Sequence, residues 1–460
     1  MNNNSVSLYF LTASLLTLLY SCGKQQTTVR LITLDPGHFH AALVQKIMYK
    51  DVSPDVYVYA PENNSDLQAH LKKIEDYNTR ADNPAQWNED IYTGADFLEK
   101  MIAEHKGNVM IVAGNNSKKT EYIEKALSAG INVLADKPMA INFENFATLE
   151  HSLDIAKQKG ALLYDIMTER FEITSVLQKE LSQISGIYGE QTTGTPENPA
   201  IEKESVHLFL KTVSGKPLIR PEWFFDTVQQ GEAIADVAVH LVDLVQWGLF
   251  PEQPIDYRTD IEMLSANHWT TSLSAKQFQE ITGADAFPDF LAKDIENNTL
   301  KVFANGEIRY KIKGINARIT VRWNYTDAAG GDTHCSIMRG SRANLVIRQG
   351  AEEKYKPTLY IEPAENIDAS LFEKDLQASF PMIEKTFAGV GLRKTAAGAW
   401  EVTIPDKYRN GHEAHFGQVM EHFLQYLKQG SLPEWETPCM IAKYYVTTKG
   451  LEMANTKKQL

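Results

Sequence analysis

The feature that most constrains the fold is a repeated alternation of short apolar runs and amphipathic segments over residues 29–166. Each run is followed by a turn and then by apolar residues at helical spacing, which predicts parallel strands joined by crossover helices. The expected strands are Val29–Leu34, Val56–Tyr59, Val109–Ala113, Ile131–Ala135 and Ala161–Ile166. The expected helices are Ala41–Tyr49, Asp66–Tyr77, Thr120–Ala129 and Glu144–Lys159. This pattern predicts a doubly wound parallel sheet of the nucleotide-binding, Rossmann type over residues 29–165.

The pattern changes after about residue 170, where apolar and polar residues alternate. Such alternation predicts an antiparallel sheet with one solvated face. The alternating runs are Ile308–Lys313, Ala317–Trp323, Ser336–Ile347, Thr358–Glu362 and Trp400–Ile404. Residues 266–291 are interpreted as helical or loop insertion, and His412–Leu427 as a late amphipathic helix. The fold class is therefore α/β, with a second α/β domain over residues 166–460 that carries an open, mainly antiparallel sheet and substrate or oligomer contacts. Its final helices are expected to pack back on the first domain.

The first residues predict export. Val6–Tyr20 is apolar but too short for a membrane-spanning helix, and Ser21-Cys22 follows it. The segment resembles a bacterial lipoprotein signal, with residues 1–21 removed, Cys22 acylated and residues 22–28 as a tether. This resemblance implies an exported, membrane-anchored lipoprotein on the periplasmic side of the cell envelope. A secretory signal with an incidental cysteine, or a short apolar tail, is the alternative.

Charge and cysteine content exclude other classes. The chain carries 59 acidic against 46 basic residues, a net charge of −13, which argues against a nucleic-acid partner. Membrane contact is expected only through the N-terminal anchor. Besides Cys22, the distant Cys335 and Cys439 do not form a disulfide framework.

Two turns at the ends of expected strands carry polar groups. After the first strand, a dinucleotide-binding fold usually has Gly-x-Gly-x-x-Gly, but the segment Asp35–His40 has the single glycine Gly37 followed by His38-Phe39-His40. One glycine at a helix start can offer N–H groups to a phosphate, or can be a plain turn. The second segment is Ala135-Asp136-Lys137-Pro138. Because ligands bind at the carboxyl ends of parallel strands, Lys137 is well placed for chemistry, although this is also ordinary turn composition.

A third group is Asp236, His240 and Asp243, spaced four and three residues apart. On one continuous helix they share a face, and acids flanking a histidine among apolar residues are costly to bury without a task. A hydrogen-bonded buried histidine is the alternative. No further ligand stands at helix or strand spacing, so no metal is expected. His412 and His415 are interpreted as a helix cap and surface, and His334 as core.

Several segments resemble the Gfo/Idh/MocA family of sugar-related oxidoreductases. They are Gly114-Asn115-Asn116, Ala129-Gly130, Asp136-Lys137-Pro138, Glu169-Arg170-Phe171, Gly186–Gly189 and the stretch from Gly231 to Asp243. The resemblance implies an NAD(P)-dependent oxidoreductase that transfers a hydride between nicotinamide and the carbon of a sugar or cyclitol hydroxyl. It also implies a homo-oligomer and a small-molecule carbohydrate substrate.

The resemblance also implies residue roles. Lys137 and His240 would be the acid/base pair, and Asp236 would orient the substrate or the imidazole. The pKa of Lys137 would be lowered if it lies beside the nicotinamide and is partly dry. The cofactor-binding candidates are Asp35, Gly37, His38, Phe39, Glu62, Asn116, Asp136 and Lys137; the substrate-binding candidates are Arg170, Trp223 and Asp243. Glu62 and the absence of arginine after the second strand favour NAD over NADP weakly.

Two other functions stay open. One is an NAD-dependent glycosidase, which would oxidise a sugar, eliminate the aglycone and return the hydride from a retained cofactor. The other is a non-catalytic sugar-binding lipoprotein on the same fold, which the missing glycines favour.

Overall fold

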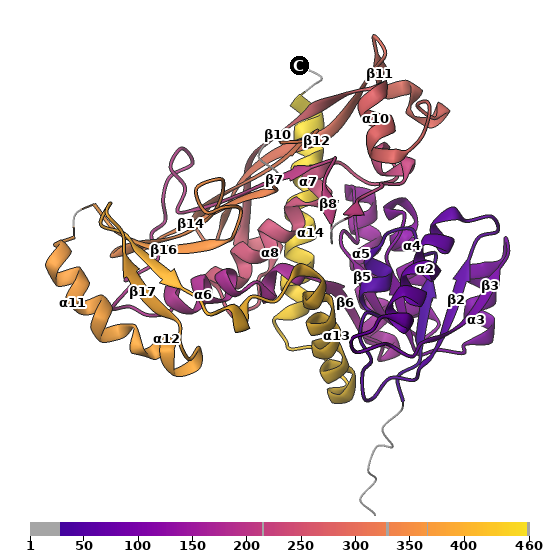
Figure 1. Cartoon of the computed structure of the whole chain (residues 1–460), viewed down its shortest axis with the longest axis horizontal. Helices are drawn as coiled ribbons and strands as arrows, with labels where there is room; N and C mark the ends of the chain where they lie inside the picture. The colour runs from indigo at the N-terminus through magenta and orange to yellow at the C-terminus, as the bar shows by residue number, and fades with distance from the viewer. Residues whose placement is uncertain (1–27, 214–215, 328–330, 366, 458–460) are drawn as a thin grey trace, which may run out of the picture.

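A computed structural model describes residues 28–213, 216–327, 331–365 and 367–457. The predicted signal peptide, the lipidation site Cys22 and nearly all of the tether lie outside these residues. Figure 1 shows two α/β regions, an indigo-to-purple N-terminal one and a larger one built on a long sheet, with the yellow C-terminal helix running between them.

The N-terminal sheet has six parallel strands in the order β3-β2-β1-β4-β5-β6. The strands are β1 (Leu31–Leu34), β2 (Asp55–Ala60), β3 (Asn88–Thr93), β4 (Val109–Val112), β5 (Asn132–Asp136) and β6 (Leu163–Ile166). The helices are α1 (His40–Leu43), α2 (Ser65–Thr79), α3 (Phe97–Glu104), α4 (Asn116–Ser128) and α5 (Phe143–Lys159). The strand order reverses between β1 and β4, which is where a doubly wound sheet opens its ligand crevice.

The five predicted strands and three of the four predicted helices are confirmed. The prediction for Ala41–Tyr49 is wrong, because α1 ends at Leu43. There the backbone turns away, and the carbonyl of Gln45 accepts a hydrogen bond from Trp87 Nε1 at 2.6 Å. Strand β3 was not predicted, because an edge strand beginning Asn-Glu-Asp shows no apolar run.

The second sheet confirms the predicted fold class. Its strand order is β10-β12-β13-β7-β14-β15-β16-β18-β17, with β11 beside β12. Within it β7 and β13 pair parallel, and the other registered pairs are antiparallel. Its strands are β7 (Ile201–Leu208), β10 (Ile261–Ser274), β11 (Ile295–Glu296), β12 (Thr299–Ile312), β13 (Ile315–Asn324), β14 (Thr333–Arg339), β15 (Ala343–Gln349), β16 (Thr358–Pro363), β17 (Gly391–Lys394) and β18 (Trp400–Thr403). A separate ribbon joins β8 (Thr212–Val213) to β9 (Lys216–Pro217).

One segment of this domain was predicted wrongly. Residues 261–274 form the long strand β10 rather than the start of an insertion, and helix α10 (Ala275–Thr282) begins only after it. The run contains many polar residues, and its pairing with β12 along its length supplies the backbone partners that the side-chain pattern does not reveal. A strand of this kind is set by its neighbour rather than by its own apolar periodicity.

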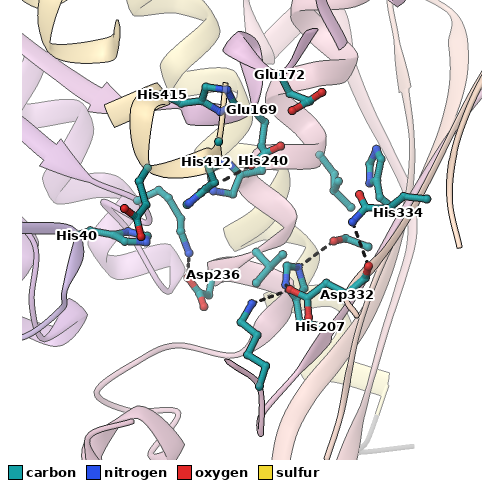
Figure 2. Close-up of a pocket in the computed structure, with 18 of the residues that line it drawn as sticks. His40, Glu169, Glu172, His207, Asp236, His240, Asp332, His334, His412 and His415 are labelled. Atoms are coloured by element: carbon teal, nitrogen blue, oxygen red, sulfur yellow. Dashed lines mark hydrogen bonds and ion pairs between the residues drawn. The ribbon is translucent and has the colours of Figure 1, made fainter. Parts of the chain in front are cut away.

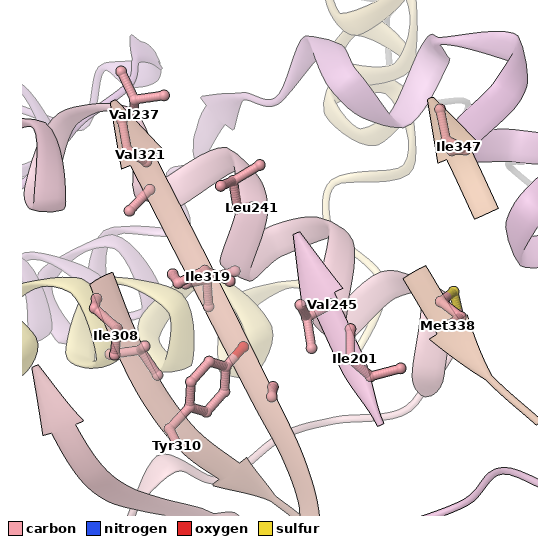
Figure 3. Packing of buried hydrophobic residues seen from close by; sticks show 14 of the residues in the cluster. Ile201, Val237, Leu241, Val245, Ile308, Tyr310, Ile319, Val321, Met338 and Ile347 are labelled. Atoms are coloured by element: carbon pink, nitrogen blue, oxygen red, sulfur yellow. The ribbon is translucent and has the colours of Figure 1, made fainter. Parts of the chain in front are cut away.

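The helices of the second domain pack on its sheet, on one another or, towards the end of the chain, against the first domain. They are α6 (Ile173–Ser182), α7 (Ala233–Asp236), α8 (Ala238–Leu249), α9 (Tyr257–Asp260), α11 (Ala369–Ser379), α12 (Pro381–Thr386), α13 (His412–Gln429) and α14 (Glu436–Lys457), with 3₁₀ turns at Thr168–Phe171, Glu222–Phe225, Asp289–Asp294 and Asp406–Tyr408. Figure 3 shows Leu241 and Val245 of α8 in one apolar cluster with Ile201 of β7 and Ile319 of β13. Burial of such side chains is the main force that holds α8 on the sheet. Helix α8 therefore has a fixed position beside the N-terminal domain.

Helix α14 ties the two domains together. It packs against β10 and α8 of the second domain and against α5 of the first. The fully buried Lys443 Nζ lies 2.9 Å from Asp165 at β6 and 2.8 Å from Asp243 of α8. A buried cation held by one carboxylate from each domain fixes how the domains face each other. Within the described residues, no helix combines the length and apolar character needed to cross a bilayer.

Candidate active site

A cavity of about 780 Å³ lies where the carboxyl edge of the Rossmann sheet faces the second domain. Its walls come from the β1–α1 turn, the residue after β5, helices α7 and α8, the start of α13 and the ends of β7 and β14. Figure 2 shows His40, Asp236 and His240 on one side, with His207, Asp332 and His334 of the sheet opposite. Segments far apart in sequence therefore present titratable groups to one space.

Lys137 and Asp236 form an ion pair at the junction of the domains. Lys137 Nζ lies 2.6 Å from Asp236 Oδ1, and Gln230 Nε2 donates to the other carboxylate oxygen at 2.9 Å. Burial alone would lower the pKa of Lys137, but the charges of Asp236 and Asp136 outweigh it, and the pKa is raised. The expectation of a lowered lysine pKa is therefore wrong. Lys137 is a cation at neutral pH, suited to stabilising negative charge rather than to accepting a proton.

His240 lines the same cavity from the first turn of α8. Its Nδ1 is buried without a hydrogen-bond partner, which leaves Nε2 as the nitrogen able to meet a bound hydroxyl. Burial, followed by the positive charge of Lys137, holds the pKa of His240 well below its usual range. A neutral imidazole beside a fixed cation has the protonation state that a general base requires.

The predicted common face of Asp236, His240 and Asp243 does not exist. The helix is interrupted at Val237, which ends α7 and begins α8. The Asp236 carboxylate therefore points at Lys137 and forms the ion pair with it. Asp243 instead forms a two-bond ion pair with Arg170 at 2.6 and 2.7 Å, away from the cavity lining. The structure thus places Asp243 and Arg170 outside the cavity lining, where Arg170 joins α8 to Glu436 at the start of α14.

The third substrate candidate, Trp223, lies at the domain junction. Its Nε1 donates to Asp66 Oδ2 at 3.0 Å, at the start of α2. It is not among the residues that line the cavity. The residues that follow continue this contact, because Asn115 donates to Gln229 at 2.8 Å and Asn116 to the carbonyl of Gln230 at 2.7 Å. Residues 223–230 therefore lie over the β4–α4 loop.

The turn after β1 differs from a phosphate-binding loop. The N–H groups of Gly37 and His38 both donate to the carbonyl of Ala113, at 3.2 and 3.1 Å. The Asp35 carboxylate accepts hydrogen bonds from Tyr122 and Asn64. A Cβ on Gly114 would lie 2.4 Å from the carbonyl oxygen of Asp35, so the β1 and β4 loops touch only because residue 114 is glycine. The loops after β1 and β4 are therefore fixed mainly by their contacts with each other.

The remaining cofactor candidates divide into two groups. His38, Phe39 and Lys137 line the cavity, whereas the exposed Glu62 lies beyond the end of β2. Asp136 is buried behind them and accepts from His40 Nδ1 at 3.0 Å.

Several cavity residues were missed from sequence. His412 and His415, interpreted as cap and surface, line the cavity at the start of α13, as does His334, interpreted as core. The three-residue spacing of His412 and His415 was the only signal available. Glu169 also lines the cavity: burial and the charge of Glu172 raise its pKa to about 7, a shift that solvent moderates because 37% of the side chain is exposed.

Comparison with known protein families places this two-domain fold in an oxidoreductase family with an NAD-binding first domain. Residues 56–165 match the family described as "Oxidoreductase family, NAD-binding Rossmann fold", and residues 177–455 match "Putative oxidoreductase C terminal domain". The chain belongs to the Gfo/Idh/MocA family of oxidoreductases, and its first domain is an NAD(P)-binding Rossmann domain. No curated protein sequence matches it.

Solved structures agree with this assignment. A "putative oxidoreductase" from Parabacteroides merdae is 62% identical, with a TM-score of 0.92, and the match covers 94% of this chain and 98% of that one. A levoglucosan dehydrogenase in complex with NADH and levoglucosan shares the fold at 12% identity and a TM-score of 0.58, covering 93% and 98%. A 3-ketoreductase from Actinomadura kijaniata with NADP shares it at 13% identity and a TM-score of 0.55, covering 91% and 96%.

The residues present fit a nicotinamide dinucleotide at its nicotinamide end. There the carboxyl edge of the sheet opens into the cavity, beside Lys137, and the glycine at position 114 keeps the β1 and β4 loops close. The phosphates would need donors other than the N–H groups of Gly37 and His38, which the Ala113 carbonyl already engages.

Proposed function

We propose that the protein transfers a hydride between a nicotinamide cofactor and the carbon of a sugar or cyclitol hydroxyl. The observation that carries the proposal is that a cationic Lys137 and a neutral His240 line one cavity at the end of β5. Oxidation of a hydroxyl-bearing carbon needs a base for the hydroxyl proton and a cation for the developing alkoxide. The cavity supplies both.

Each residue has one task in this mechanism. The nicotinamide, when bound, accepts or returns the hydride. His240 takes the hydroxyl proton at Nε2, and Lys137 Nζ stabilises the alkoxide oxygen. Asp236, itself held by Gln230, keeps the lysine charged and oriented. His38, Phe39 and Lys137 would hold the nicotinamide half, whereas Asn116 is buried and bonded to Gln230 and Lys119. The absence of an arginine near Glu62 favours NAD.

The opposite wall supports a carbohydrate substrate. The ring of Trp323 lines the cavity and stacks on His207 with centroids 4.9 Å apart. His207 contacts Ser205 at 2.8 Å and lies 3.4 Å from Asp332. An apolar ring face beside fixed polar groups is the usual composition of a site for a small polyhydroxylated ligand. The levoglucosan complex of a protein with this fold points in the same direction.

The test begins with the cofactor. Purified protein is denatured and its released NAD(H) and NADP(H) are measured, and NADH binding is titrated by fluorescence. A panel of monosaccharides, cyclitols and glycosides is then assayed for turnover. His240→Ala should lower turnover roughly 100- to 10,000-fold while cofactor binding is retained. His151→Ala, at an exposed histidine of α5, is the matched control. No cofactor binding at millimolar concentration would instead indicate a sugar-binding protein without redox activity.

A second candidate is a redox-assisted glycosidase that keeps its cofactor. Two observations favour it: residues 223–230 lie across the dinucleotide edge, and Glu169, with a pKa raised to about 7, can protonate a leaving group. Such an enzyme would release the aglycone without any accumulation of free NADH. Aglycone release together with net NADH formation would exclude it.

Export and lipidation at Cys22 complete the proposal. Free nicotinamide cofactor is scarce outside the cytoplasm, so an exported enzyme would be expected to retain its own. Cys22→Ala should move the protein from the membrane to the soluble fraction of cells; unchanged membrane association would contradict lipidation. A homo-oligomer, as in the family, is checked by light scattering of the soluble form.

A further inference from the structure

Three side chains able to bind a metal converge beside Lys137. His38 and His40 come from the turn after β1, and Asp136 is the last residue of β5. One ligand atom of each lies within 4.8 Å of the other two. His40 Nδ1 is 3.0 and 3.1 Å from the two Asp136 oxygens, and His38 Nδ1 is 3.9 Å from Oδ2. Nitrogen and oxygen ligands thus point at one small volume.

In this arrangement a nitrogen lone pair of His38 faces a carboxylate oxygen of Asp136. The backbone N–H of His40 donates to His38 Nδ1 at 3.4 Å, so that nitrogen carries a lone pair rather than a proton. The same nitrogen faces the buried Asp136 carboxylate, an acceptor. Two acceptors that face each other in a dry place repel, and a cation between them removes the repulsion.

Nearby cations do not fill this role. Lys119 Nζ donates to the Asp136 carbonyl and to Asn116, and Lys137 Nζ donates to Asp236. Among the described residues, the Asp136 carboxylate thus has the His40 imidazole as its side-chain hydrogen-bond partner, with His38 Nδ1 further away and no lysine on its oxygens.

We propose that His38, His40 and Asp136 bind a divalent first-row transition-metal ion, with Zn²⁺ as the reference ion. Two neutral imidazoles and one carboxylate are the ligands that Zn²⁺, Fe²⁺, Co²⁺ and Mn²⁺ share. Three protein ligands leave at least one coordination position open, and His38 and His40 both line the cavity. An oxygen of a bound molecule can therefore complete the coordination sphere next to Lys137.

The site needs neither residue of the proposed acid/base pair. A protein that binds the metal but not a nicotinamide cofactor would support this inference and contradict the redox function, and the reverse result would do the opposite. All measurements are therefore made without cofactor.

The experiment measures Zn²⁺ alone. The soluble protein is stripped with a chelator, dialysed and titrated with Zn²⁺ by calorimetry, and the bound metal is counted by mass spectrometry. We expect about one ion per chain. His38→Ala and His40→Ala should each weaken binding by at least the roughly 100-fold that loss of an outer-shell partner can cost. His151→Ala, on the exposed face of α5, should bind as the unsubstituted protein does.

A second measurement keeps the inference testable if a variant does not fold. Co²⁺ added to the stripped, unsubstituted protein should give visible absorption bands typical of nitrogen and oxygen coordination, and Zn²⁺ should abolish them. Absence of these bands, or Zn²⁺ binding by folded His40→Ala within twofold of the unsubstituted protein, would overturn the site and leave His40 and Asp136 as a simple hydrogen-bonded pair.

Discussion

Replacement of the Lys137–Asp236 pair tests whether this contact organises the cavity. Lys137→Met removes the cation and leaves a carboxylate that is only 6% exposed, and Asp236→Asn leaves an ammonium that is 13% exposed. Loss of one partner of a buried pair costs roughly 3–5 kcal/mol. The double variant leaves no unpaired charge, and its asparagine can still contact Gln230. We therefore expect it to be more stable than the sum of the single effects predicts, by about 1–3 kcal/mol.

The assay is urea unfolding of all four proteins at pH 7, followed by circular dichroism. The raised pKa of Lys137 means that its stabilisation is complete below the ordinary lysine pKa and is lost only as the pH rises through the higher folded value. Unfolding at pH 7 therefore measures the full stabilisation that the Lys137–Asp236 ion pair provides. Lys72→Met is the matched control, because Lys72 and Glu75 lie 2.7 Å apart but are 64% and 63% exposed, and it should leave stability unchanged.

Additive effects of Lys137→Met and Asp236→Asn would refute this reasoning, because they would show that the two side chains do not interact in solution. Turnover gives a second reading. If Lys137 stabilises the alkoxide, the folded Lys137→Met protein should lose roughly 100- to 1,000-fold in kcat. Turnover close to that of the unsubstituted protein would reduce the lysine to a structural role.

The remaining predictions concern stability. Burial lowers the pKa of Lys203 to about 7, so the unfolded chain binds more protons than the folded one between pH 7 and 10.5, and stability should rise across that window by up to about 5 kcal/mol. Lys203→Met should flatten this rise in urea unfolding measured at stepped pH. A pH profile parallel to that of the unsubstituted protein would contradict the assignment. Arg170→Met leaves Asp243 with Lys443 as its remaining cation and should cost roughly 3–5 kcal/mol. An unchanged melting temperature would show that Lys443 alone is enough to hold Asp243. Gly114→Ala should cost on the order of 1–3 kcal/mol, because the added Cβ forces the β1 and β4 loops apart. Gly411→Ala is the control and should be neutral, since a Cβ there meets no atom within 4 Å. Equal melting temperatures for the two variants would contradict the close approach of the loops.

Features of this protein that neighbouring residues encode were predicted better than features set by distant contacts. Gly130, Gly160 and Gly430 each follow a helix in the left-handed conformation, a local requirement that the sequence shows directly as a glycine. The strand ending at Asp136 was predicted because a strand buried on both faces is a continuous apolar run. Strand β10 was not predicted, because its pairing with the later strand β12, and not its own side-chain pattern, makes it a strand.

The same distinction applies to the site. Sequence placed Lys137 at the carboxyl end of a strand and His240 near it, and both line the cavity. It could not show that the helix breaks at Val237, which sends Asp236 to Lys137 and Asp243 to Arg170. It also could not show that His412 and His415, from the start of α13, would join the cavity wall.

The sequence by itself determined the two-domain α/β class, the strand that ends in Asp136-Lys137 and the family, because apolar periodicity and short motifs are written in neighbouring residues. Only the tertiary structure decided which charges pair, which histidines meet and that Lys137 has a raised pKa. Those properties depend on burial and on charges brought within a few ångströms by segments about a hundred or more residues apart, and no local pattern encodes that distance.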